Sequence, residues 1–186
     1  MVLVFAALAC RRGENPAVSV PAGARSGDIV CRRGRGAVSA LFAERASAAR
    51  RFSHAGVVWV DSAGRLWVIH TEAEPDGNGR SGVRLQPYAA FAAESRRVAF
   101  YRLPVSDLVA SAVADTALAL LARGIPFDLD FDTATDSALY CTELVAAAVN
   151  RAAGDSLIRP AWRWRGRRYY GLDDLTSIAV PLTTEP

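Results

Sequence analysis

Two neighbouring apolar runs stand in the first half of the chain. Residues 53–60 (SHAGVVWV) and 65–73 (RLWVIHTEA) are rich in β-branched and aromatic side chains, and the turn-forming residues DSAG, 61–64, separate them. This pattern predicts two antiparallel strands joined as a hairpin. Shorter apolar runs predict further strands over 29–31, at the beginning of 83–95, and over 96–104.

Three other segments have the spacing of apolar residues that is typical of helices. They are 37–51, 105–124 and 141–153, and the last two are followed or closed by glycine, at Gly124 and Gly154. Ser106 stands where the second of these helices would need an N-terminal cap. Most strands precede the last two helices, so the order of elements predicts an α+β fold rather than alternating βαβ units.

The composition is that of an ordinary globular protein. A chain of 186 residues with 51% hydrophobic and 22% charged residues can bury a core within one domain. All 22 basic residues are arginine, and the net charge of +3 is mild. The densest basic segment, RWRGRRYY at 163–170, could contact nucleic acid, but no nucleic-acid-binding motif accompanies it. We therefore expect an aromatic-anchored, solvated segment and no nucleic-acid partner.

The N-terminus leaves two interpretations open. The apolar run from Met1 to Ala9 is too short to span a bilayer and ends directly before Cys10. Ala9 and Cys10 resemble the end of a bacterial lipoprotein signal, whereas Ala7 fits less well and a charged n-region is missing. In one interpretation residues 1–25 are a truncated signal and tether, a lipidated Cys10 gives membrane association in the cell envelope or periplasm, and 26–186 form the enzyme domain. In the other, the run is a buried strand of a cytoplasmic protein.

The three cysteines, Cys10, Cys31 and Cys141, are too far apart to suggest a disulfide framework. The chain has no CxxC and no His-x₃₋₅-His pattern, so we expect no zinc motif and no cofactor. Cys31 lies within a predicted strand, where a packed thiol is expected. Cys141 stands at a predicted helix start, where it is either a small core residue or a thiolate stabilised by the helix N-terminus. We interpret Glu143, in the same turn, as structural.

Both histidines of the chain, His54 and His70, lie in the predicted hairpin. A loop with an odd number of residues would place His54, His70 and Glu72 on one face of the sheet, because side chains alternate with a period of two. The four-residue loop DSAG would instead oppose His54 to Thr71 and turn His70 to the other face. If the face is shared, His54 can act as a base and His70 can orient it, with Glu72 in reserve.

Six short motifs occur in an order that resembles one family. They are GDIV (27–30), FSHAGVVW (52–59), WVIHTEA (67–73), VRLQPYAAF (83–91), GIPFD (124–128) and LYCTELV (139–145). Together, over roughly residues 26–160, they resemble the permuted papain-like enzymes of the NlpC type, most closely the YiiX-like branch, which are related to lecithin retinol acyltransferase-like enzymes. In that family the histidine strand precedes the cysteine helix, as it does here.

The resemblance implies a circularly permuted papain-like fold, in which an antiparallel sheet packs against helices and the cysteine begins a helix. It also implies Cys141 as nucleophile, His54 as base and His70 as the third polar residue, although many YiiX-like chains have Glu at the last position. Asp128 falls in the G-x-P-[YF]-D motif, and we expect it to cap a loop. Tyr140 either lines the cleft or packs beneath the helix.

The function that follows is a cysteine hydrolase working through an acyl-thioester on Cys141. Its substrate would be a peptide or a small acyl-containing molecule, such as a cell-envelope peptide or lipid, and the enzyme could be an amidase, a peptidase, an ester hydrolase or an acyltransferase. The alternative is a non-catalytic ligand-binding module on the same fold, in which Cys141 and His54 only pack. An interaction protein that uses residues 160–170 on an anionic surface is a third hypothesis.

Overall fold

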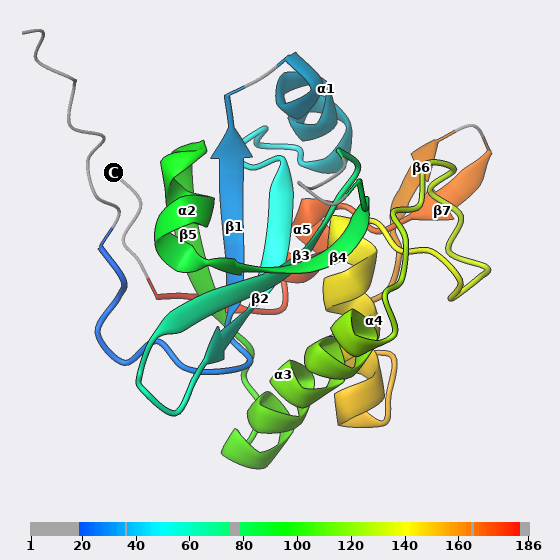
Figure 1. The fold of residues 1–186 in the computed structure, drawn as a ribbon. Coiled ribbons are helices and arrows are strands. Elements are labelled where there is room, and N and C mark those ends of the chain that lie inside the picture. The colour runs from blue at the N-terminus through cyan, green and yellow to red at the C-terminus, as the bar shows by residue number, and fades with distance from the viewer. Residues whose placement is uncertain (1–18, 36, 75–78, 165, 183–186) are drawn as a thin grey trace, which may run out of the picture.

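A computed structural model of the chain describes residues 19–35, 37–74, 79–164 and 166–182 (Figure 1). Cys10 and the predicted lipoprotein signal lie outside the described residues. The elements in chain order are β1 (Ile29–Gly34), α1 (Ala37–Ala46), β2 (His54–Val60), β3 (Leu66–Glu72), β4 (Gly82–Pro87), α2 (Tyr88–Ala93), β5 (Ser95–Arg102), α3 (Asp107–Ala122), α4 (Cys141–Ala153), β6 (Trp162–Trp164), β7 (Arg167–Tyr169), α5 (Leu172–Thr176) and β8 (Val180–Pro181).

One antiparallel sheet organises the fold. Its six strands run in the order β4-β3-β2-β1-β5-β8, and each described pair is antiparallel. The long helices α3 and α4 lie on one side of this sheet, and the short helix α2 lies against β3, β4 and β5 (Figure 1). The predicted α+β class, with an antiparallel sheet packed against helices, is confirmed.

Strand residues alternate between two separate hydrophobic clusters. Ile29, Val57 and Ile69 are fully buried in the larger cluster, which includes the inward faces of α3 and α4. Their neighbours Val30 and Val58 belong to a smaller cluster with Tyr88 and Phe91 of α2. The sheet is therefore covered on both faces. Alternate residues of a strand point to opposite faces, so a residue's position in the strand decides which helices its side chain contacts.

The loop between β2 and β3 contains five residues, 61–65, rather than the four of DSAG. The Asp61 carboxylate accepts hydrogen bonds from the backbone N–H groups of Ala63 and Arg65, at 3.0 and 2.9 Å, and so stabilises the turn. Val60 consequently pairs with Leu66, and Val57 with Ile69. An odd loop was one of the two alternatives that the sequence left open.

Several boundaries agree with the sequence. The Ser106 side chain accepts a hydrogen bond from the Val109 N–H at 3.3 Å and caps α3. Gly154 ends α4 in the left-handed conformation, with φ of 66°. The helix predicted over 37–51 is too long, because α1 ends at Ala46 and Arg50 has a left-handed φ of 53°.

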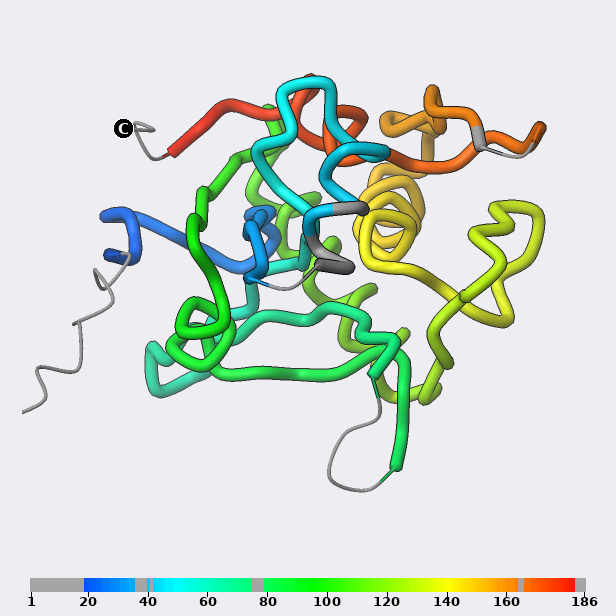
Figure 2. The backbone as a smooth tube through the Cα atoms, turned by 90° about the horizontal axis from the view of Figure 1, so that it is seen from above, coloured from blue at the N-terminus to red at the C-terminus, as the bar shows by residue number. Residues whose placement is uncertain are grey.

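The segment after residue 160 is more ordered than expected. It forms a two-stranded hairpin, β6 and β7, and then α5 and β8, none of which its sequence pattern predicted. Figure 2 shows this segment beside α1, where the Ala48 N–H donates to Asp173 at 2.6 Å and the Tyr169 hydroxyl donates to the Arg45 carbonyl. Within the described residues, no helix has the length and apolar character needed to cross a membrane.

Gly56, at the centre of β2, leaves no room for a side chain. A Cβ atom there would lie 2.5 Å from Val68 Cγ1 and 2.9 Å from the Ile69 carbonyl oxygen. We expect Gly56→Ala to lower the free energy of unfolding by about 1–3 kcal/mol through overpacking, as measured by urea denaturation. In a Val68→Ala background the loss should be smaller, because the nearest clashing atom is gone. A change below about 0.5 kcal/mol in the wild-type background would contradict this packing.

Candidate active site

The register of the sheet brings the side chains of two arginines and two histidines to one pocket. Arg32 of β1 is the cross-strand partner of His54, and Arg84 of β4 is the partner of His70. His54, His70 and Glu72 project on the α2 side, where both histidine rings contact Phe91, at centroid distances of 5.9 and 5.3 Å. The Arg32 guanidinium stacks on the same ring, 4.4 Å from its centroid. The shared face that an odd loop predicts is therefore present.

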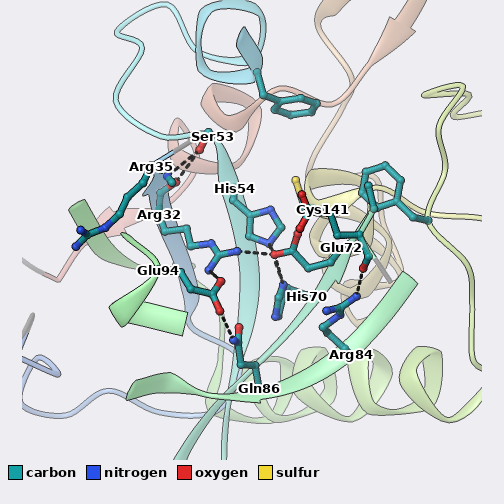
Figure 3. Close-up of a pocket in the computed structure, with 15 residues that line it drawn as sticks. Arg32, Arg35, Ser53, His54, His70, Glu72, Arg84, Gln86, Glu94 and Cys141 are labelled. Atoms are coloured by element: carbon teal, nitrogen blue, oxygen red, sulfur yellow. Dashed lines mark hydrogen bonds and ion pairs between the residues drawn. The ribbon is translucent and has the colours of Figure 1, made fainter. Parts of the chain in front are cut away.

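The two histidines are in direct contact. His54 Nε2 lies 2.9 Å from His70 Nδ1, at hydrogen-bond distance (Figure 3). Glu72 Oε1 lies 3.6 Å from His54 Nε2 and 3.5 Å from His70 Nδ1. His70 is therefore the group that makes the closest polar contact to His54, and Glu72 stands beside both rings.

A network of charged and amide groups surrounds this pair. Arg32 bonds to Glu72 at 2.5 Å and to Glu94 at 2.6 Å, and the Gln86 amide donates to Glu94 at 2.9 Å (Figure 3). Sequence reasoning missed Arg32, Gln86 and Glu94, because each is an isolated polar residue in its own segment. Only the strand register, which no local pattern reveals, places them around the histidines.

Burial keeps both imidazole rings uncharged. Desolvation, followed by the positive charges of Arg32 and Arg84, lowers the pKa of His70 to about 3. Desolvation also lowers the pKa of His54 well below 6.5, and His70, Arg32 and Arg84 act in the same direction. The pKa of Glu72 is raised by burial, against the opposing effect of Arg32. At neutral pH both histidines are thus free of charge.

The contact between the two rings is compatible with either tautomer, and Gln86 favours one of them. Gln86 interacts with His70 and raises its pKa, although the Gln86 Oε1 and His70 Nε2 atoms do not reach ordinary hydrogen-bond geometry. An amide oxygen facing Nε2 favours the proton on that nitrogen, so His70 Nδ1 accepts and His54 Nε2 donates. The remaining nitrogen of His54, Nδ1, is then unprotonated and able to accept a proton.

Cys141 is the first residue of α4, and the extended backbone of Tyr140 precedes it. Its side chain is only 3% exposed. Burial raises the pKa of the thiol to about 12, while the backbone N–H groups of Ala55 and Thr142 at the sulfur act in the opposite direction. Cys141 and His54 line the same pocket. Among the described hydrogen bonds, none joins the Cys141 thiol to the His54 ring. The resting pair is therefore a neutral thiol and a neutral imidazole.

Tyr170, in the segment after β7, forms hydrogen bonds to the first residues of α4. The Tyr140 hydroxyl accepts from the Tyr170 N–H at 2.7 Å, and the Thr142 hydroxyl donates to the Tyr170 carbonyl at 2.6 Å. Tyr140 is fully buried, which is the packing alternative for this residue. Glu143 is also buried, and its burial raises the pKa of the carboxyl to about 8.

Asp128 caps the loop before α4, as its motif predicts. Its carboxylate accepts from the backbone N–H groups of Asp130 and Asp132, at 2.8 and 2.6 Å. The loop leads through Leu139, whose N–H donates to the Pro126 carbonyl at 3.0 Å, directly to the cysteine. Asp128 thereby orders the chain that delivers Cys141 and does not line the pocket with it.

The pocket around these groups has a volume of about 550 Å³. Among the described residues its charged lining is balanced, with three arginines and three glutamates, and two aromatic side chains face it from outside the sheet; these residues are Arg32, Arg35, Arg84, Glu72, Glu74, Glu94, Phe42 and Phe127. Such a lining suits a neutral polar group better than a highly charged ligand.

A cysteine at a helix N-terminus, facing a strand histidine that precedes it in the chain, defines a papain-like cysteine hydrolase of permuted topology. The chain belongs to the YaeF/YiiX C92 family of permuted papain-like amidase enzymes, whose match covers residues 23–157. The protein is thus a cysteine peptidase or amidase by family.

The fold is also similar to a solved structure, that of metalloprotein YiiX from Escherichia coli O157:H7. The two chains share 17% sequence identity with a TM-score of 0.67, and the similarity covers 87% of this chain and 97% of the other. At this identity the likeness shows the fold alone. No curated protein matches the sequence significantly.

The lowered histidine pKa values make stability depend on pH. Below pH 6.5 the unfolded chain binds protons at His54 and His70 that the folded chain does not, so folding weakens as pH falls. Each histidine contributes about 0.7 kcal/mol per pH unit at pH 6.5, rising to about 1.4 kcal/mol per pH unit near pH 5. We expect the urea-derived unfolding free energy of His70→Gln to fall less steeply between pH 6.5 and 5 than that of the wild type. Parallel slopes for the two proteins would contradict the buried, uncharged His70.

Proposed function

We propose that the protein hydrolyses an amide or ester bond through an acyl-thioester on Cys141, with His54 as the general base and acid. The observation that carries the proposal is the position of His54. Its Nε2 is held at 2.9 Å by His70, and it lines one pocket with the thiol at the N-terminus of α4. A nucleophile, a base and a group that orients the base are the elements of this chemistry.

The neutral resting pair determines how the first step proceeds. The Cys141 sulfur attacks the carbonyl carbon while its proton passes to His54 Nδ1, so charge develops only as the substrate reacts. The tetrahedral intermediate then collapses, the C–N or C–O bond breaks, and His54 returns the proton to the leaving amine or alcohol. Water attacks the thioester carbonyl and gives one proton to His54. The C–S bond then breaks, His54 returns this proton to the Cys141 sulfur, and the carboxylic acid is released.

The beginning of α4 can stabilise the negative oxygen of that intermediate. Cys141 is the first helical residue, so its backbone N–H has no partner within the helix. The helix dipole adds to the effect of this N–H. The backbone N–H of Ala55 lies at the Cys141 sulfur and lowers the pKa of its thiol. It therefore favours negative charge on the sulfur, next to the developing oxyanion.

His70 is the proposed orienting residue, with Glu72 as its support. A hydrogen bond from His54 Nε2 to His70 Nδ1 keeps the lone pair of His54 on Nδ1. Glu72, 3.6 Å from His54 Nε2, can stabilise the imidazolium that forms during the reaction. The substrate class that we propose is a peptide or a small acyl compound, since the charges that line the pocket balance.

The first test compares the cysteines and the base. We expect iodoacetamide to modify Cys141 faster than Cys31 in peptide mapping, because Cys31 is fully buried within β1, whereas Cys141 lines the pocket. Cys141→Ala and His54→Ala should lower kcat/KM on peptide amides or activated acyl esters by about 10²–10⁴-fold, with Cys31→Ala as the control. Equal alkylation of the two thiols together with full activity of Cys141→Ala would refute the proposal.

One observation favours the alternative of a non-catalytic binding module: the Cys141 side chain is 3% exposed and its thiol pKa is about 12. In that case Cys141 fills space at the start of α4, and the wild-type protein turns over no amide or ester. Cys141→Ser would then bind the same ligands as the wild type with unchanged affinity. Turnover that Cys141→Ser loses, while it keeps its fold by circular dichroism, decides for the enzyme.

A further inference from the structure

We propose that His54, His70 and Glu72 form a binding site for Zn²⁺ or a similar divalent transition metal, and that the bound metal switches the cysteine chemistry off. The three ligand atoms, His54 Nε2, His70 Nδ1 and Glu72 Oε1, all lie within 4.8 Å of one another. Two imidazoles and one carboxylate are a common ligand set for zinc. The inhibitory half of this inference rests on the proposed function, whereas the binding half does not.

The spacing of the ligand atoms suits a tetrahedral ion. Bonds of about 2.0–2.2 Å at tetrahedral angles place neighbouring ligands roughly 3.3–3.5 Å apart. The three separations here are 2.9 Å between the histidine nitrogens and 3.6 and 3.5 Å from these nitrogens to the Glu72 oxygen. Metal binding requires the two rings to separate by a few tenths of an ångström and to turn until both lone pairs point at the ion, and it replaces their hydrogen bond.

Outer groups already hold two of the ligands. Arg32 bonds to the same Glu72 oxygen, Oε1, at 2.5 Å and is itself fixed by Glu94, so a bound ion has to share this oxygen with the guanidinium or use the other carboxylate oxygen. Gln86 lies at the far side of His70, where a metal-bound imidazole would carry its N–H. Such partners fix ring orientation and raise the basicity of ligands. His70 Nε2 is buried and has no hydrogen bond in the described structure. With the metal on Nδ1, this nitrogen would carry the proton of the ring.

The electrostatics of the site are mixed but compatible with binding. Arg32 and Arg84 oppose a cation, while Glu72, Glu74 and Glu94 line the same pocket and favour it. The pocket opening leaves the fourth coordination position to water or a small anion, as in zinc sites with three protein ligands.

Metal at this position would remove the base. An imidazole that binds metal through Nε2 while neutral carries its proton on Nδ1, and that nitrogen is the one that must accept the Cys141 proton. Cys141 itself is not in the ligand set, so its thiol stays protonated and unreactive rather than being coordinated. The same three side chains therefore have two exclusive uses.

Titration of the full chain, stripped with EDTA and dialysed, tests the binding half. Competition against a chromophoric chelator at pH 7.5 should show one Zn²⁺ per chain, and Glu72→Gln and His54→Asn should each weaken binding about 10–100-fold. Glu44→Gln, a matched change on an exposed carboxylate outside the pocket, and Cys141→Ala should bind as the wild type does. Unchanged affinity in Glu72→Gln and His54→Asn, or loss of binding in Cys141→Ala, would overturn the site.

Alkylation of Cys141 with and without Zn²⁺ tests the inhibitory half. Saturating zinc should slow the reaction of Cys141 with iodoacetamide at least about 10-fold, EDTA should restore it, and Glu72→Gln should need correspondingly more zinc. Tight one-to-one binding with unchanged alkylation would overturn the inhibition and keep the metal site. A metal-free Cys141 that reacts no faster than Cys31 would refute the proposed function, while the titration still decides the metal site.

Discussion

The antiparallel register of β2 on β3 is the constraint on which the rest of the site depends. Because the loop between them has five residues, His54, His70 and Glu72 share the α2 face of the sheet. A change of one residue in that loop would send His70 into the hydrophobic cluster under α3 and α4 and break its contact with His54. The hydrogen bonds that Asp61 accepts from Ala63 and Arg65 therefore act on the chemistry as well as on the turn.

Burial then sets the character of the site. The rings of His54 and His70 and the thiol of Cys141 are all desolvated, and for each of them burial is the largest cause of a pKa shift toward the neutral form. A pair of this kind differs from a preformed thiolate and imidazolium, because the proton has to move with the attack on the substrate.

Much of the fold could be predicted from the sequence, because its local patterns agree with the final structure. The strands predicted from the apolar runs at 53–60 and 65–73, the cap at Ser106 and the glycine at Gly154 all appear where expected. The hairpin of β6 and β7 could not be predicted, since it depends on contacts such as that between Tyr169 and Arg45, which are distant in sequence.

Part of the site was also predictable from local sequence patterns. Cys141 and His54 stand in local motifs, whereas the parity that unites His54 with His70 depends on whether Arg65 belongs to the loop or the strand. Arg32 is recognisable only from its register with His54, and Gly56 only from its closeness to Val68 and Ile69. Long-range pairing, not residue type, gives these positions their roles.

If the protein is a cysteine hydrolase, the substrate's acyl group is bound covalently to Cys141 during each turnover, and trapping this acyl-enzyme is the most direct test. The protein is mixed with an activated acyl ester, stopped in acid within the first turnover, and measured by intact-mass and peptide mass spectrometry. The account predicts one added acyl group, located on Cys141, removable by hydroxylamine, and longer-lived in His54→Ala because deacylation also needs the base. Turnover with no acyl group on Cys141, or with the acyl group on another residue, would contradict it.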